Sequence, residues 1–194
     1  LIANEVCLYK SGMIYSKFEI ENLKKKRYKE FYPNGQLLYV ENYYENNNKE
    51  YTTYNEDGTL YKSQKISFTE DYKLNVIKYF YKNSNILFEI TEQKNFFKPY
   101  CLKKCYKSLS NYKSYYKNGN VEEEYNHLFL NLSKYKLKHG LYKYFHKNGN
   151  LKFIGNYNEG IPEGNYKIFD EDNNLIEESQ FTQKFKIYKL RNHY

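Results

Sequence analysis

Apolar residues recur along this chain in short runs that are separated by turn residues, and the runs themselves repeat. Aligned on a turn glycine, seven segments carry an apolar residue four places before this anchor and another two places after it. The anchors are Gly12, Gly35, Gly58, Ser84, Gly119, Gly149 and Asn173, spaced by 23, 23, 26, 35, 30 and 24 residues. The flanking positions hold Leu8, Phe31, Tyr54, Phe80, Tyr115, Phe145 and Phe169 before the anchor, and Ile14, Leu37, Leu60, Ile86, Val121, Leu151 and Leu175 after it. Periods of this length are typical of repeat proteins whose copies are single supersecondary units.

The turn residues predict the shape of each copy. Asn-Gly or Asp-Gly between apolar runs is a strong hairpin signal, and the four such pairs are Asn34-Gly35, Asp57-Gly58, Asn118-Gly119 and Asn148-Gly149. A three-residue loop, a type I turn closed by a left-handed glycine, suits the fixed φ of Pro33 and sets Phe145 directly opposite Leu151. A two-residue type I′ loop would pair Phe145 with Lys152 instead. We therefore predict the three-residue loop, with a glycine bulge at each full turn.

The predicted fold is all-β, an open antiparallel meander of about seven β-hairpin repeats in an elongated single-sheet or solenoid-like array. Each copy has room for two strands and two short connections, and residues 1–194 form a single array. At the two anchors without glycine, Asn173 should tolerate the left-handed conformation, whereas Ser84 should be strained by it. A single hairpin is barely stable alone, so stability becomes a sum over neighbouring copies.

Insertions near residues 91–110 and 126–139 interrupt the period. Long loops in repeat proteins often lie on a binding face. Alternatively, each insertion lengthens a hairpin or covers an exposed edge, and we favour this second interpretation. If the insertions do contact a partner, their apolar side chains are the candidate contacts: Phe96, Phe97, Tyr100, Leu128 and Phe129.

Composition supports a sheet in which few side chains are fully buried. The chain has 194 residues, of which 26 are Tyr and 13 are Phe, while Trp is absent. Aromatic residues favour strands, and Tyr combines an apolar ring with a hydroxyl that reaches water, so a deep core is not required. The 31 Lys and Arg residues against 23 Asp and Glu give a net charge of +8, which would favour anionic partners. Codon usage rich in A and T explains much of this excess, and we prefer that explanation.

No catalytic, cofactor or metal site is predicted. The phosphate-loop, metalloprotease and nucleophile-elbow motifs are missing from the sequence. Cys101 and Cys105 are expected to be free thiols, and Cys7 a buried cysteine of a strand. The histidines show no metal-site spacing; they are His127, His139, His146 and His193. The acidic runs at 122–125 and 170–172 are interpreted as a strand face and a turn. Lysines and arginine at 24–27, with the basic end of the chain, favour nucleic-acid binding only weakly.

Residues 140–174 spell the repeat most clearly. The pattern is a glycine, a spaced aromatic residue, an aromatic pair, Asn-Gly, a leucine, a second aromatic residue and a further Glu-Gly. These places are taken by Gly140, Tyr142, Tyr144, Phe145, Asn148, Gly149, Leu151, Tyr157, Glu159 and Gly160, and Gly164 and Tyr166 open the next copy. The pattern resembles the MORN repeat variant family of bacteria. The match is good in copies six and seven, fair in two, three and five, and weak in one and four.

The resemblance implies successive hairpins in an open sheet and no established catalytic residues. It also implies a family in which some proteins are antitoxin or immunity components and others are surface or secreted interaction proteins. We expect a non-enzymatic module that binds a protein partner and neutralises a toxin, without a cofactor. The alternatives are a peripheral membrane or cell-surface module that binds anionic lipid, and nucleic-acid binding. No apolar run approaches the ~20 residues that a membrane span needs. The expected location is the cytoplasm, or the cell surface or exterior if a leader has been removed.

Overall fold

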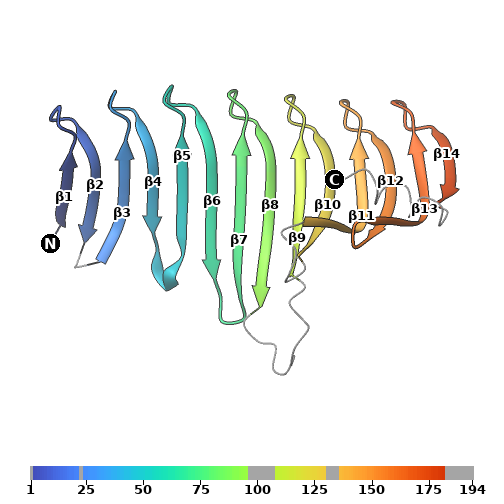
Figure 1. Ribbon diagram of the computed structural model, residues 1–194, viewed down its shortest axis with the longest axis horizontal. Helices are drawn as coiled ribbons and strands as arrows, with labels where there is room; N and C mark the ends of the chain where they lie inside the picture. The colour runs from blue at the N-terminus through green and yellow to red at the C-terminus, as the bar shows by residue number, and fades with distance from the viewer. Residues whose placement is uncertain (1, 22–23, 96–107, 130–135, 182–194) are drawn as a thin grey trace, which may run out of the picture. The chain divides into compact units, whose positions relative to one another are not determined.

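The computed structural model describes residues 2–21, 24–95, 108–129 and 136–181. These residues form fourteen β-strands and one short 3-10 turn, η1 (Glu45–Asn47), with no α-helix (Figure 1). Strand order follows chain order from β1 to β8 and from β9 to β14, and neighbouring strands pair antiparallel in an open sheet, which confirms the predicted all-β meander. The strands are β1 (Ile2–Leu8), β2 (Ile14–Glu21), β3 (Lys24–Phe31), β4 (Leu37–Tyr43), β5 (Lys49–Tyr54), β6 (Leu60–Phe68), β7 (Tyr72–Phe80), β8 (Ile86–Asn95), β9 (Ser108–Tyr115), β10 (Val121–Phe129), β11 (Lys136–Phe145), β12 (Leu151–Asn158), β13 (Ile161–Phe169) and β14 (Leu175–Gln180). Among the described residues, no helix reaches the length and hydropathy of a membrane-spanning segment.

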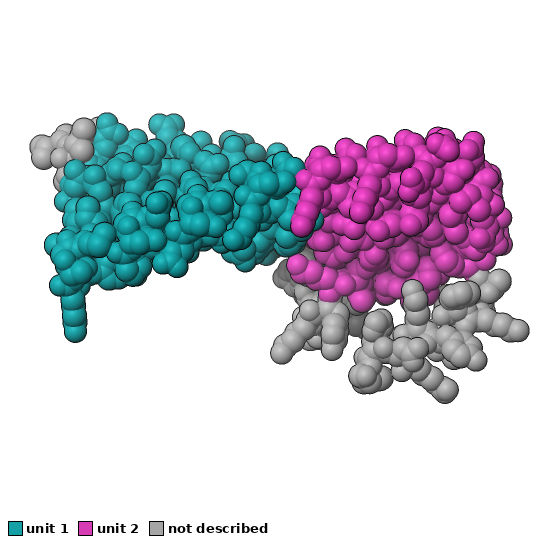
Figure 2. Space-filling model, turned by 90° about the horizontal axis from the view of Figure 1, so that it is seen from above, with its two compact units in different colours: residues 1–98 teal, residues 99–194 magenta. Residues whose placement is uncertain are grey.

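The chain divides into two compact units, residues 1–98 with β1–β8 and residues 99–194 with β9–β14 (Figure 2). Within each unit, the main contacts of a strand are with its neighbours in the chain. Few apolar side chains are buried, and in the described part of the chain they are Val40, Ile90, Tyr125 and Leu128. Most strand residues are half-buried on both faces of the sheet. Stability therefore comes from contacts between adjacent strands and not from a central core.

Each predicted hairpin is present, with the predicted register. The apolar residue four places before each anchor pairs directly with the apolar residue two places after it. The pairs are Leu8–Ile14, Phe31–Leu37, Tyr54–Leu60, Phe80–Ile86, Tyr115–Val121, Phe145–Leu151 and Phe169–Leu175. In every turn the backbone N–H of the anchor donates to the carbonyl oxygen three residues earlier, at 2.8–3.1 Å. The anchors have φ between +66° and +94°. This geometry is the three-residue loop closed by a left-handed residue.

Every hairpin also contains a second bulge, which the sequence pattern does not predict. The third residue after the anchor has no partner across the hairpin. In copy six, for example, Tyr144 pairs with Phe153 and Phe145 pairs with Leu151, so Lys152 between them is unpaired in the register. The extra residue turns its side chain to the same face as the next one. Accordingly, the Lys152 ammonium lies 5.5 Å from the ring centroid of Tyr144. The bulge thus adds one more side chain per copy to the face of the sheet that carries Tyr144.

Ser84 provides a direct test of the turn geometry. It occupies the anchor position with φ +66°, where a side chain costs roughly 1 kcal/mol relative to glycine. We expect Ser84→Gly to raise the free energy of unfolding by up to about 1 kcal/mol, partly offset by the greater freedom of glycine in the unfolded chain. Thermal denaturation followed by circular dichroism measures the change. The matched control is Gly119→Ser, at φ +92° with nothing within 4 Å of an added Cβ, which should lose stability through backbone strain alone. A less stable Ser84→Gly variant would contradict the argument.

Hydrogen bonds also link successive turns within each unit. The residue three places before the anchor donates to a backbone carbonyl of the next hairpin, as in Tyr9 to Phe31 (2.9 Å), Tyr32 to Tyr54 (3.0 Å) and Tyr116 to Phe145 (2.7 Å). The Nε2 atom of His146 lies 3.0 Å from the Phe169 carbonyl oxygen and continues the series. Turn asparagines add a second row of such bonds, since Asn148 Nδ2 donates to Glu171 O at 2.7 Å. The turn residues therefore fix the spacing between copies as well as the bend within each one.

Two sequence interpretations change with the structure. Cys7 is exposed and not buried as expected, because β1 has a strand neighbour on one side only among the described residues and no layer covers its faces. The insertion near 126–139 does lengthen strands: residues 126–129 extend β10 and pair with residues 136–139 of β11. This agrees with the favoured interpretation of that insertion. Residues 96–107 of the other insertion lie outside the described residues.

Candidate functional site: the tyrosine face

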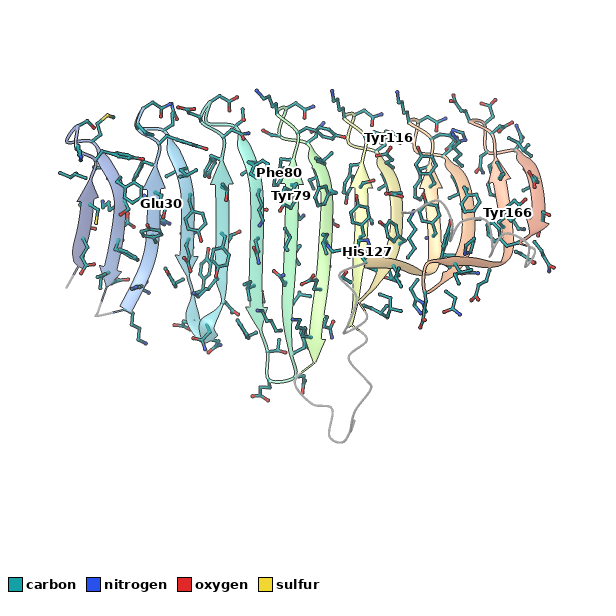
Figure 3. The ribbon with its side chains drawn as sticks, viewed as in Figure 1. Glu30, Tyr79, Phe80, Tyr116, His127 and Tyr166 are labelled. Carbon is teal, nitrogen blue, oxygen red and sulfur yellow. The ribbon has the colours of Figure 1, made fainter. Side chains whose placement is uncertain are left out.

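The two faces of the sheet carry different side chains. Side chains two residues apart on a strand share a face, and ring contacts between neighbouring strands show which residues do so. In each unit one face is rich in tyrosine and is here called the tyrosine face. Its residues are Tyr28, Tyr39, Tyr51 and Tyr79 in the first unit and Tyr112, Tyr125, Tyr142, Tyr157 and Tyr166 in the second. Figure 3 labels Tyr79 and Tyr166 among them.

In the first unit, tyrosine hydroxyls on this face donate to carboxylates two residues along the same strand. Tyr28 donates to Glu30 at 2.6 Å, and Tyr39 donates to Glu41 at 3.4 Å (Glu30 is labelled in Figure 3). The Lys49 ammonium donates to the other oxygen of Glu41 at 3.0 Å. The carboxylates of this face are thus already paired within the chain.

In the second unit, a lysine is enclosed by aromatic rings. The Lys138 ammonium lies 3.7 Å from the ring centroid of Tyr142, 4.6 Å from that of Tyr125 and 5.9 Å from that of Tyr157. It also donates to Glu123 Oε2 at 3.3 Å, and the Tyr142 hydroxyl donates to the same oxygen at 3.0 Å. Cation–π contacts and a charge-assisted hydrogen bond therefore act on one ammonium.

Next to this cluster lies His127, which is 7% exposed (Figure 3). Its Nε2 atom is 3.1 Å from the Tyr125 hydroxyl oxygen, and its ring packs against those of Tyr112 and Tyr125. Burial, with the nearby charges of Lys136 and Lys138, lowers the pKa of His127 to about 4. The imidazole is therefore neutral at physiological pH.

Tyr28 and Tyr142 of this face are held as neutral hydrogen-bond donors. Burial, reinforced by the hydrogen bond to Glu30, raises the pKa of Tyr28 to about 12. Burial and the charge of Glu123 raise the pKa of Tyr142 further. Neutral hydroxyls beside paired carboxylates suit contact with a partner surface. Among the described residues, no group of three or more His, Cys, Asp or Glu side chains is arranged to hold a metal ion.

The opposite face carries ion pairs between neighbouring strands. The pairs are Lys78–Glu89 at 3.3 Å, Lys113–Glu124 at 3.4 Å and Lys167–Glu178 at 3.2 Å. Such partly exposed pairs contribute little to stability, and they leave a neutral polar surface. Glu124 belongs to the acidic run 122–125, and Asp170 of the other acidic run accepts the backbone N–H groups of Asp172 and Asn174 within its own turn. Glu124 and Asp170 are therefore structural, whereas Glu123 of the first run belongs to the tyrosine face.

The basic residues at 24–27 are largely compensated. Lys26 lies 3.5 Å from Glu21, Arg27 lies 3.9 Å from Glu19, and Arg27 Nε also donates to Asn42 at 2.8 Å. Positive charge without acidic neighbours in sequence is found in residues 96–107, 130–135 and 182–194, which contain no Asp or Glu. The nine Lys and Arg residues of these segments account for the net charge of +8 of the whole chain. The remaining strands and turns are therefore close to neutral. The described strands therefore carry little net positive charge to attract nucleic acid.

Of the predicted contact residues, Leu128 is the one whose side chain belongs to the described part of the chain. Phe96, Phe97 and Tyr100 lie outside the described residues, as does the side chain of Phe129 at the end of β10. Leu128 is 1% exposed, so a partner would reach it only after a rearrangement. The tyrosine face was missed as a candidate site, although the spacing Tyr-x-Glu in β3 and β4 is visible in the sequence.

The hairpin with an Asn-Gly turn and flanking tyrosines corresponds to a known repeat. Four segments match the MORN repeat variant. They are residues 25–46, 111–128, 138–159 and 162–183, which fall in copies two, five, six and seven. Copy three, expected to match from its sequence pattern, lies outside the matched segments. A comparison with curated proteins finds no match. MORN repeats are non-catalytic modules that generally mediate contacts with proteins or membranes.

Proposed function

We propose that the chain is a non-enzymatic protein-binding module that acts as an immunity protein or antitoxin, with the tyrosine face as its contact surface. The observation that carries this proposal is the row of half-buried tyrosines on a sheet face that no other element of the described residues covers. Tyrosine supplies a large contact area at a low cost in side-chain entropy. The carboxylates of the tyrosine face, such as those of Glu41 and Glu123, are held in place by hydrogen bonds from tyrosine hydroxyls.

A toxin is the partner class that the sequence resemblance suggests, since some proteins with this repeat variant are immunity components. Blocking a toxin needs a broad, preformed surface and no catalysis. The four segments that match a non-catalytic repeat support a binding function for the chain. The cytoplasm is the proposed location, because a toxin made in the same cell must be blocked there.

Co-expression with the product of the adjacent gene tests this proposal. We expect the chain to restore the growth of cells that make a toxic neighbour product, and to co-elute with that product in gel filtration. Paired substitutions on the two faces locate the surface: Tyr51→Ala on the tyrosine face should weaken the complex, and Lys78→Ala on the opposite face should not. Absence of both rescue and complex would refute the proposal.

An anionic lipid surface is the second candidate, favoured by the basic residues that lack acidic neighbours in sequence. They are Lys98, Lys103, Lys104, Lys107, Lys134, Lys184, Lys186, Lys189 and Arg191. Sedimentation with vesicles of phosphatidylserine and phosphatidylcholine at low and high salt separates the two functions, because screening weakens electrostatic attachment. Pelleting at low salt that disappears at high salt would favour the lipid.

A further inference from the structure

A hollow opens on the tyrosine face of the first unit, with a volume of about 260 Å³. Its lining residues are Tyr39, Tyr51, Thr53, Lys62 and Gln64, from β4, β5 and β6. The strand register explains why it forms. Tyr39 pairs with Thr53, and Thr53 pairs with Lys62, so these three side chains stand in one row across three strands. The short Thr53 between two long side chains leaves the space.

Lys62 differs from Lys49 and Lys138, two other lysines of the tyrosine face. Lys49 and Lys138 each donate to a glutamate, Glu41 and Glu123 respectively. In the part of the chain that the structure describes, the Lys62 ammonium has no carboxylate partner and lies 5.4 Å from the ring centroid of Tyr79. A half-buried ammonium gains most from a carboxylate when one can reach it.

The other polar groups of the hollow are compatible with the same ligand. The Tyr51 and Thr53 hydroxyls make no hydrogen bond to another described residue, so both are free to donate. Gln64 is fixed in position because its Nε2 atom donates to Asn75 Oδ1 at 3.0 Å. Glu41, whose carboxylate lies on the same face, is engaged by Tyr39 and Lys49.

We infer that this hollow binds an aspartate or glutamate side chain of the protein partner, with Lys62 as the counter-charge and Thr53 and Tyr51 as hydrogen-bond donors. The inference rests on the proposed function and adds to it the chemistry of the partner: an acidic residue presented beside two tyrosine rings. The rings of Tyr39 and Tyr51, with centroids 6.2 Å apart, would cover the aliphatic part of that side chain.

A capped (Gly-Glu)₄ peptide tests the site without knowledge of the partner. Titration followed by ¹H–¹⁵N NMR should shift the backbone amides of Thr53, Lys62 and Gln64, and a (Gly-Gln)₄ peptide should not. Lys62→Met keeps the stem of the side chain and removes its charge, so we expect at least a tenfold weaker interaction. The matched control is Lys65→Met on the same strand, an odd number of residues away and exposed, which should bind within about twofold of the unchanged protein.

The outcomes separate this inference from the proposed function. Equal binding of the glutamate and glutamine peptides, or equal losses in Lys62→Met and Lys65→Met, would overturn the acidic-ligand site. If the adjacent gene product binds Lys62→Met as tightly as the unchanged chain, the site is wrong while the proposed function stands. If the peptide binds at Lys62 but no protein partner is found, the site stands and the proposed function fails. Unchanged thermal denaturation of both variants shows that neither is misfolded.

Discussion

Leu128→Ala should lower the free energy of unfolding of the second unit by about 2–5 kcal/mol, the range for a truncated buried leucine. Leu128 is 1% exposed, the most deeply buried large side chain among the described residues. It pairs with Leu109 of β9 on one side and Leu137 of β11 on the other. The strand register holds the two neighbouring leucines in place, so they cannot close fully over the space left by the lost methyl groups and a cavity persists.

Urea denaturation and hydrogen exchange measure this effect. Because repeat proteins are stabilised by nearest neighbours, amides of β9–β11 should lose most protection, and those of β1–β4 should keep theirs. The matched control is Leu109→Ala, a leucine in the same row that is 49% exposed, with an expected loss below about 1 kcal/mol. A Leu128→Ala variant with unchanged stability and weaker partner binding would instead support Leu128 as the contact residue that the sequence suggested.

The hairpins were predictable because each depends on local chemistry. An Asn-Gly pair such as Asn148-Gly149 specifies its own turn, and the turn fixes the pairing of Phe145 with Leu151. Even the exceptions followed, since Asn173 and Ser84 both adopt positive φ. The second bulge was not predicted because its residue is hydrophobic in some copies, as Tyr61, and charged in others, as Lys152. No residue type marks it.

The candidate site was less predictable because it depends on which side chains meet across strands. Tyr28 and Glu30 stand two apart on one strand, so period-two alternation could have revealed that pair. Glu123 and Tyr142 come from strands of different copies, and the register between copies depends on bulges and inserted residues. The hollow at Lys62 needed three strands in register, which no local pattern specifies.

Acidification should destabilise the second unit through His127. Its pKa is about 4 in the folded protein and about 6.5 in an unfolded chain. Between these values the unfolded state binds more protons than the folded state. Stability is therefore highest above about pH 6.5 and falls as the pH drops towards 4. A difference of this size corresponds to a loss of up to about 3 kcal/mol.

The physical origin is the burial of the ring beside two lysines. The buried imidazolium of a protonated His127 would be poorly hydrated, and Lys136 and Lys138 would repel its charge. Attraction to Glu123 offsets part of this unfavourable free energy. We expect His127→Gln to flatten the decline of the unfolding free energy between pH 6.5 and 4, whatever its stability at pH 7. Urea titrations at intervals of half a pH unit measure the slope. Leu109→Ala, which changes no titrating group, serves as the control and should keep the slope of the unchanged protein. An equally steep decline in His127→Gln would show that other groups, and not this buried imidazole, set the acid sensitivity of the second unit.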